Sequence, residues 1–251
     1  MNEIIKTMGG TLEFSPGTHR YIWDGEKVDL SVSAVAAQFA VPFGVASRWA
    51  ARIVKNELNK VLSDGTNEIF DVAEWSKTIC AEPDRQARRA AEVGSGVHRW
   101  VEDWAHSLSP EWSDEPEIAQ CQRGVAEWCK EHLDRVIHIE HRLYSRKWRI
   151  AGTCDMVARM RDGKTYVLDW KGVTDLDASL KYRPGHVAQL TAYRSMLEEA
   201  GEKIDGCILV RFSRATGQVE ATSFSNYEAD LAAFEAALHL ARYKVHGDVE
   251  K

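Results

Sequence analysis

The sequence predicts a mixed α/β protein in which a helical N-terminal half packs around a β-sheet. Helical patterns dominate the first half, and the second half follows the order strand, strand, strand, helix, strand, strand, helix. Strands interrupted by a single helix are typical of an α/β domain with a mixed sheet. The sequence shows no convincing linker. We therefore expect a single domain over residues 1–251, with a hairpin and helices in 1–133 and the α/β core in 134–251.

Turn signals and helical periodicity define the first half. Asp24-Gly25 is a strong turn signal between apolar segments, so residues 12–32 are expected to form a hairpin with strands at 21–23 and 28–30. Three segments with helical periodicity follow: 46–62, 71–104 and a third that ends near residue 133.

Strand patterns dominate from residue 134 onwards. Pro184 introduces a helix over 185–200, because proline is favoured in the first helical turn. Ser225 and Glu228 form a capping box before a closing helix. Strands are expected in five segments: 136–140, 154–160, 166–170, 207–210 and 219–224.

Charge and composition exclude several classes of protein. The net charge of −6 argues against a protein that coats nucleic acid, although it allows a local basic track. The five cysteines are scattered without a C-x-x-C pair, which argues against a structural zinc or an iron–sulfur cluster. No apolar run reaches the roughly 20 residues of a membrane span. The first residues lack an apolar signal core, so we expect a cytoplasmic protein.

The strongest chemical signal is a pair of acidic residues followed by a lysine. Asp155 lies on one expected strand, and Asp169-Trp170-Lys171 ends the next. Side chains alternate along a strand, so Asp169 and Lys171 share one face while Trp170 points to the other. An acid and a lysine on an apolar strand are costly without a partner, and Mg²⁺ or Mn²⁺ would supply one. Such an ion activates water and polarises phosphate, which points to cleavage of nucleic acid.

This site depends on the register of the hairpin that joins the two strands. A two-residue turn at Asp162-Gly163 would place Asp155 opposite Trp170, and the two acids would face opposite ways. A three-residue loop with Gly163 in a left-handed conformation places Asp155 opposite Asp169. We predict the three-residue loop.

Four further residues are candidates for supporting roles. His98 and Glu102 lie one helical turn apart, as do Gln189 and Tyr193. Each pair alone is more often a surface or core pair, so the order and spacing of the whole set carry the signal. Glu140 lies in the middle of a strand, where it either supports the site or faces solvent.

In this order the residues resemble the PD-(D/E)xK nuclease superfamily, and within it the RecB-like and Cas4-like branch that includes phage-type exonucleases. The resemblance rests on four motifs: Gly94–Glu102, Gly152–Asp155, Asp169–Lys171 and Gln189–Tyr193. It implies a restriction-endonuclease-like sheet flanked by helices. No cysteine follows Cys207, so the chain departs from the members that hold an iron–sulfur cluster.

The resemblance also implies roles for individual residues. His98, Asp155, Asp169 and the carbonyl of Trp170 would bind the metal, Mg²⁺ or Mn²⁺, and Lys171 would be the catalytic lysine. The implied function is a DNA exonuclease in phage or bacterial recombination, replication or repair. It would act in the cytoplasm, or in the host cytoplasm if phage-encoded. A recombination or annealing protein, or a helicase, is the kind of partner implied.

Two alternatives stay open. The first is a structure-specific endonuclease of the same superfamily. The second is a catalytically silent DNA-binding or scaffold protein that has kept the fold.

Overall fold

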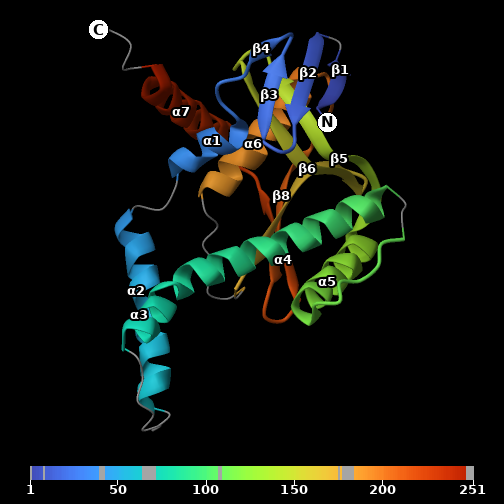
Figure 1. Ribbon diagram of the computed structural model, residues 1–251. Coiled ribbons are helices and arrows are strands. Elements are labelled where there is room, and N and C mark those ends of the chain that lie inside the picture. Colours follow the sequence, from blue (N-terminus) through green and yellow to red (C-terminus); the bar gives the residue numbers. More distant parts are fainter. Residues whose placement is uncertain are drawn as a thin grey trace.

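The computed structural model describes residues 2–7, 9–39, 43–63, 72–106, 109–174, 176 and 184–246 (Figure 1). Two sheets and two groups of helices make up this part of the chain. None of the helices in the described residues is long and apolar enough to span a membrane.

A five-stranded mixed sheet forms the centre, as predicted. Its spatial order follows the chain, and each pair of neighbours is antiparallel except β7 and β8, which are parallel. The helix α6 (Pro184–Glu199) lies between these two strands in the sequence, as a parallel connection requires. The strands are β5 (Leu133–Ser145), β6 (Ile150–Met160), β7 (Thr165–Val173), β8 (Gly206–Ser213) and β9 (Val219–Phe224).

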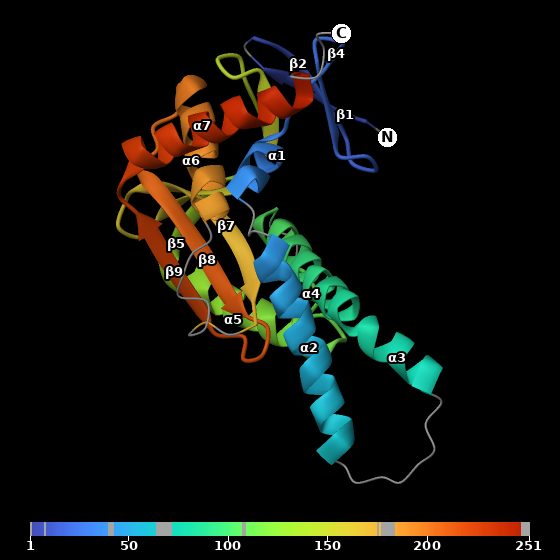
Figure 2. The same cartoon turned by 90° about the vertical axis from the view of Figure 1, so that its left-hand side faces the viewer.

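Helices cover both faces of this sheet (Figures 1 and 2). On one face, α6 and α7 (Tyr227–His246) enclose an apolar core with Val167 and Leu209 of the sheet. On the other face, α4 (Glu82–Ala105) and α5 (Pro116–His132) enclose a second core with Leu168 and Trp170. Because β7 and β8 are buried from both sides, both are apolar along most of their length.

A smaller antiparallel sheet precedes the helices. It orders β1 (Glu3–Thr7), β2 (Gly10–Ser15), β3 (Arg20–Trp23) and β4 (Glu26–Lys27) side by side. The predicted turn is present, since Asp24 and Gly25 both have positive φ values, of 49° and 84°.

The predicted strand at residues 28–30 is wrong. Val28 N still donates a hydrogen bond to Tyr21 O of β3 at 3.0 Å. The chain then leaves the small sheet and runs towards the central one, where the carbonyl of Leu30 accepts a hydrogen bond from Ala151 N at 3.4 Å. Ser31 then forms a parallel bridge with Ala151. Beyond Val28, the contact with the central sheet therefore replaces the local hairpin pairing.

The helical segment expected at 71–104 is two helices instead of one. α3 (Val72–Cys80) ends before Ala81, and α4 begins at Glu82. Pro83 is the reason, because its ring removes a backbone donor and favours the first turn of a helix. The preceding elements are α1 (Val32–Ala36), η1 (Ala37–Phe39) and α2 (Phe43–Ser63).

Candidate active site

The loop between β6 and β7 has the predicted register. Met160 and Lys164 close the loop, with Met160 N donating to Lys164 O at 2.8 Å. Gly163 is left-handed, with a φ of 82°, and its N donates to Met160 O at 2.9 Å. Met156 pairs with Leu168, so the same register places Asp155 opposite Asp169. The three-residue loop is confirmed, and both acids emerge on one face.

Asp169 is a buried carboxylate with one oxygen left over. Only 1% of the surface of Asp169 is exposed to solvent. Lys171 Nζ donates to Asp169 Oδ1 at 2.7 Å, whereas no hydrogen-bond partner among the described residues reaches Oδ2. Burial raises the pKa of Asp169, and Lys171 only partly offsets this. An uncompensated carboxylate oxygen in this position fits a cation.

Lys171 is held in its charged form by the same neighbours. Burial lowers its pKa, but the charges of Asp169 and Asp155 together raise it above the ordinary value. The ammonium group is therefore a fixed positive charge beside the two acids.

Asp155 joins β6 to the backbone of β7 and approaches His98. Its Oδ2 accepts a hydrogen bond from Trp170 N at 3.1 Å and lies 3.7 Å from His98 Nδ1. The side chain is thus fixed in place next to Asp169 on the following strand.

His98 reaches this cluster from α4, which crosses the sheet in Figure 1. Its Nε2 donates to the carbonyl of Trp170 at 3.0 Å. Burial lowers the pKa of His98, but Asp155 and the nearby Glu140 raise it to about 9. The imidazole is therefore charged in the metal-free protein at neutral pH, and it must lose a proton before it can bind a metal.

Glu140 belongs to the cluster. The sequence leaves open whether this residue supports the site or faces solvent, and the structure places it at the site. The pairs on either side of it, Ile139 with Met156 and His141 with Cys154, place it opposite Asp155. Its Oε1 lies 3.9 Å from His98 Nδ1, and ligand atoms of Glu140, His98 and Asp155 lie within 4.8 Å of one another. Its φ of 45° is unusual for a residue in a strand, and no sequence pattern signals it.

Glu102 lies at the edge of the cluster. Its pKa is raised by burial and then by the charge of Glu140. The charged groups that act on it are Glu140, His106, Asp103 and Arg142, and neither Asp155 nor Asp169 is among them.

Tyr193 and Gly152 explain why two of the motifs occur together. Tyr193 is 3% exposed and packs against Gly152, where an added Cβ would lie 2.7 Å from Tyr193 Cε1. Burial raises the pKa of Tyr193 well above its ordinary value, while a hydrogen bond with Gln189 acts in the opposite direction. Gln189, Tyr193 and Gly152 also line one cavity with Asp155.

Sequence reasoning missed the wall that the N-terminal sheet gives to this cavity. The cavity measures about 220 Å³, and Phe14, His19 and Tyr21 line it together with Arg142. Tyr21 and Thr153 share a hydrogen bond of 2.8 Å between their hydroxyl oxygens. The alternation of Phe14 and Tyr21 with polar neighbours predicts a buried face, but nothing local indicates which site that face covers.

Comparison with known families agrees with this geometry. A sequence profile described as the PD-(D/E)XK nuclease superfamily matches residues 119–246, which is just over half of the chain. The chain belongs to the PD-(D/E)XK nuclease superfamily. The matched residues of this nuclease include Asp155, Asp169, Lys171 and Tyr193, whereas His98 lies before them and is placed by geometry alone.

Several solved structures are similar to the chain at low identity. The alkaline exonuclease LHK-Exo from Laribacter hongkongensis is 12% identical, with a TM-score of 0.45 over 88% of this chain and 89% of its own. The structure of LHK-Exo in complex with dAMP is also 12% identical, with a TM-score of 0.46 over 87% of this chain and 88% of its own. A putative exonuclease from Eubacterium rectale is 13% identical, with a TM-score of 0.43 over 63% and 69%. No curated protein sequence matches the chain significantly.

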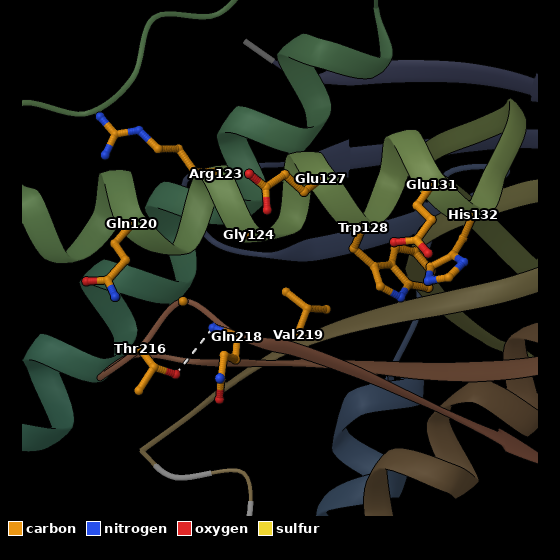
Figure 3. A pocket seen from close by; sticks show the side chains of 11 residues that line it. Gln120, Arg123, Gly124, Glu127, Trp128, Glu131, His132, Thr216, Gln218 and Val219 are labelled. Atoms are coloured by element: carbon orange, nitrogen blue, oxygen red, sulfur yellow. Dashed lines mark hydrogen bonds between the residues drawn. The ribbon is translucent and has the colours of Figure 1, made fainter.

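A larger cavity of this PD-(D/E)XK chain lies away from these acids. It measures about 410 Å³ and opens between α5 and the turn that joins β8 to β9. Figure 3 shows Glu131 and His132 at one end of it, and Thr216 and Gln218 across from α5. None of the predicted site residues lines it, so the chemistry and not the volume identifies the candidate active site.

Proposed function

We propose that this chain is a DNA exonuclease that hydrolyses phosphodiester bonds with Mg²⁺ or Mn²⁺. The observation that carries the proposal is the buried Asp169 Oδ2 without a hydrogen-bond partner among the described residues. Asp169 interacts electrostatically with Asp155 and His98, and His98 bonds to the carbonyl of the next residue, Trp170. A nuclease of this superfamily needs such a set of donors around its substrate phosphate.

The metal ligands in this proposal are His98, Asp155, Asp169 and the carbonyl of Trp170. Three of the four donors are oxygens, which is the preference of Mg²⁺ and Mn²⁺. His98 Nε2 and Trp170 O lie 3.0 Å apart, close to the separation of about 3 Å between adjacent ligands of an octahedral ion. When bound, the ion lowers the pKa of a water molecule and polarises a phosphate oxygen.

Lys171 acts on the reacting phosphate in this proposal. Its ammonium group is charged at neutral pH because the neighbouring acids raise its pKa. A fixed cation at this point stabilises negative charge that develops on the phosphate oxygens and orients the attacking water.

The remaining candidates support the site. Tyr193 packs against Gly152 and so fixes the start of the segment that leads to Asp155, and Gln189 bonds to Tyr193. Glu140 faces His98 and orients its ring, while Glu102 adds negative charge further out. Gln189 has an amide that can also contact a phosphate or a base from the cavity wall.

The preference for DNA ends follows from the resemblance to RecB-like exonucleases. We place the activity in the cytoplasm, in recombination, replication or repair of phage or bacterial DNA. A recombination or annealing protein, or a helicase, would supply or consume the DNA end.

The test compares end-labelled linear DNA with covalently closed circular DNA. Each substrate is incubated with Mg²⁺, Mn²⁺ or EDTA, and the wild-type chain is run beside Asp169→Ala and Lys171→Ala. Lys164→Ala is the matched control, because it removes the same charge from an exposed residue of the loop before β7. We expect nucleotide release from linear DNA only, dependent on metal, lost in both site variants and retained in the control.

Other results would select the alternatives. Nicking of closed circles would identify a structure-specific endonuclease. Binding of DNA without cleavage, unchanged in Asp169→Ala and Lys171→Ala, would identify a catalytically silent DNA-binding or scaffold protein.

A further inference from the structure

We propose a second metal site in this protein, formed by His138, His141 and Glu202, which binds Zn²⁺. The two histidines lie on β5, and Glu202 follows the end of α6. This site is separate from the ligands that we propose for catalysis, and it has a different set of donor atoms.

The three side chains are already gathered. One ligand atom from each lies within 4.8 Å of the other two. His138 Nε2 lies 3.0 Å from Glu202 Oε1 and 3.1 Å from Oε2, and the two imidazole rings stack with centroids 4.1 Å apart. Ligands of a tetrahedral Zn²⁺ lie about 3.4 Å apart, so small rotations of the rings would complete the site.

The spacing of the two histidines makes their meeting unusual. Residues three apart in a regular strand point to opposite faces of the sheet. Here Glu140, which lies between the two histidines, has a positive φ of 45°. This distortion breaks the alternation, and the two rings stack on one side of the strand. The distorted residue, Glu140, is the one that approaches His98.

The backbone at Glu202 is fixed by the end of α6. Gly201 is left-handed, with a φ of 91°, and its N donates to Glu198 O at 3.0 Å. Glu202 N donates to Leu197 O at 3.0 Å, which completes a Schellman motif. All three ligands therefore start from ordered backbone, and an ion would join the end of α6 to β5.

The donor set selects Zn²⁺ over the ions of the active site. Two imidazole nitrogens and one carboxylate are a common three-residue set for zinc with an open fourth position. Mg²⁺ instead prefers oxygen ligands and octahedral geometry. The His138 and Glu202 side chains are 30% and 31% exposed, so an ion can reach the site from solvent.

The test uses full-length protein in which the proposed catalytic ligands are disabled by His98→Ala and Asp169→Asn. This parent is freed of metal with a chelator and titrated with ZnCl₂, and separately with MgCl₂, by calorimetry. We compare it with the parent plus His141→Ala, the parent plus Glu202→Gln, and the parent plus His239→Ala. His239 is an exposed histidine of α7 outside both clusters and serves as the control. Circular dichroism checks that each variant is folded.

We expect the parent to bind one Zn²⁺ per chain and to melt at a higher temperature with Zn²⁺, since the ion binds only the folded state. His141→Ala and Glu202→Gln should each weaken binding by more than about tenfold, as expected for the loss of a ligand. His239→Ala should bind like the parent, and MgCl₂ should neither bind the parent nor raise its melting temperature.

Two outcomes would overturn the proposal. A folded parent that binds no Zn²⁺ would show that His138 and Glu202 form only an ion pair. Binding that persists at full affinity in folded His141→Ala and Glu202→Gln would place the ion elsewhere. His141→Gln, which keeps the size of the side chain, replaces His141→Ala if the latter unfolds.

Discussion

Single glycines decide how closely the motifs of the active site can pack. An added Cβ at Gly152 would lie 2.7 Å from Tyr193 Cε1 and 2.9 Å from Val32 Cγ2, whereas at Gly94 it would meet no atom within 4 Å. We expect Gly152→Ala to lower the free energy of unfolding by about 1–3 kcal/mol through overpacking. Gly94→Ala should raise it by up to about 1 kcal/mol, because alanine favours the helix. Urea denaturation measures both, and equal stability of the two variants would refute this packing account.

The charge state of His98 makes metal binding dependent on pH. Its pKa is about 9 in the metal-free protein, compared with an ordinary value of 6.5. Protonated His98 therefore stabilises the fold fully at a pH below 6.5, and this stabilisation is lost as the pH rises through about 9. Metal binding must displace this proton. We therefore expect the affinity for Mn²⁺ to rise about tenfold per pH unit between pH 7 and 9 and then to level off.

Calorimetric titration with Mn²⁺ at several pH values tests this dependence. His98→Asn should bind more weakly and with a shallower slope. A wild-type affinity that is flat across this range would mean that His98 is not a ligand.

Strand alternation alone predicts that Asp169 and Lys171 lie on one face of the sheet. The position of Glu140 could not be predicted, because it depends on a positive φ value that no local pattern of this sequence signals. The contacts of Tyr193 with Gly152 depend on a helix and a strand that are distant in the chain.

At the level of elements, the loop between β6 and β7 sets the register that brings Asp155 and Asp169 together. Gly163 has a φ of 82°, and the nearest atom to an added Cβ is Arg159 Nη2 at 3.8 Å. The cost of a substitution is therefore conformational. We expect Gly163→Ala to destabilise the protein by about 1–2 kcal/mol and Gly163→Asn by less, because asparagine tolerates this conformation. Thermal unfolding would contradict this if the asparagine variant were the less stable one.

The same loop shows what sequence can predict about elements. Its register followed from Gly163 and from the need to place two acids on one face. The break between α3 and α4 was missed because the helical periodicity continues past Pro83, although proline cannot continue a helix from the preceding turn. The strand predicted at 28–30 is wrong because the bonding to β3 ends at Val28, and Leu30 bonds to Ala151 of the central sheet instead.

At the level of the whole molecule, we propose that the two sheets belong to one domain. Tyr21 of β3 bonds to Thr153 of β6 at 2.8 Å, and Ser31 pairs with Ala151. Tyr21→Phe should lower the free energy of unfolding by about 0.5–1.5 kcal/mol by removing this hydrogen bond. Tyr243→Phe is the control, since Tyr243 is 72% exposed.

If the two sheets belong to a single domain, we also expect the protein to unfold in one cooperative transition. Tryptophan fluorescence and circular dichroism should give coincident urea curves for the wild type and for Tyr21→Phe. Two separate transitions would show that the N-terminal sheet unfolds independently.

We propose that Asp169 holds the metal while Lys171 acts on the phosphate, and one paired measurement tests both roles. Mn²⁺ affinity and cleavage of linear DNA are measured on the same preparations of wild type, Asp169→Asn, Lys171→Met and the control Lys164→Met. We predict that Asp169→Asn loses both binding and cleavage, that Lys171→Met loses cleavage but still binds Mn²⁺, and that Lys164→Met keeps both. Cleavage at the wild-type rate by either site variant, or unchanged Mn²⁺ affinity in Asp169→Asn, would rule out these roles.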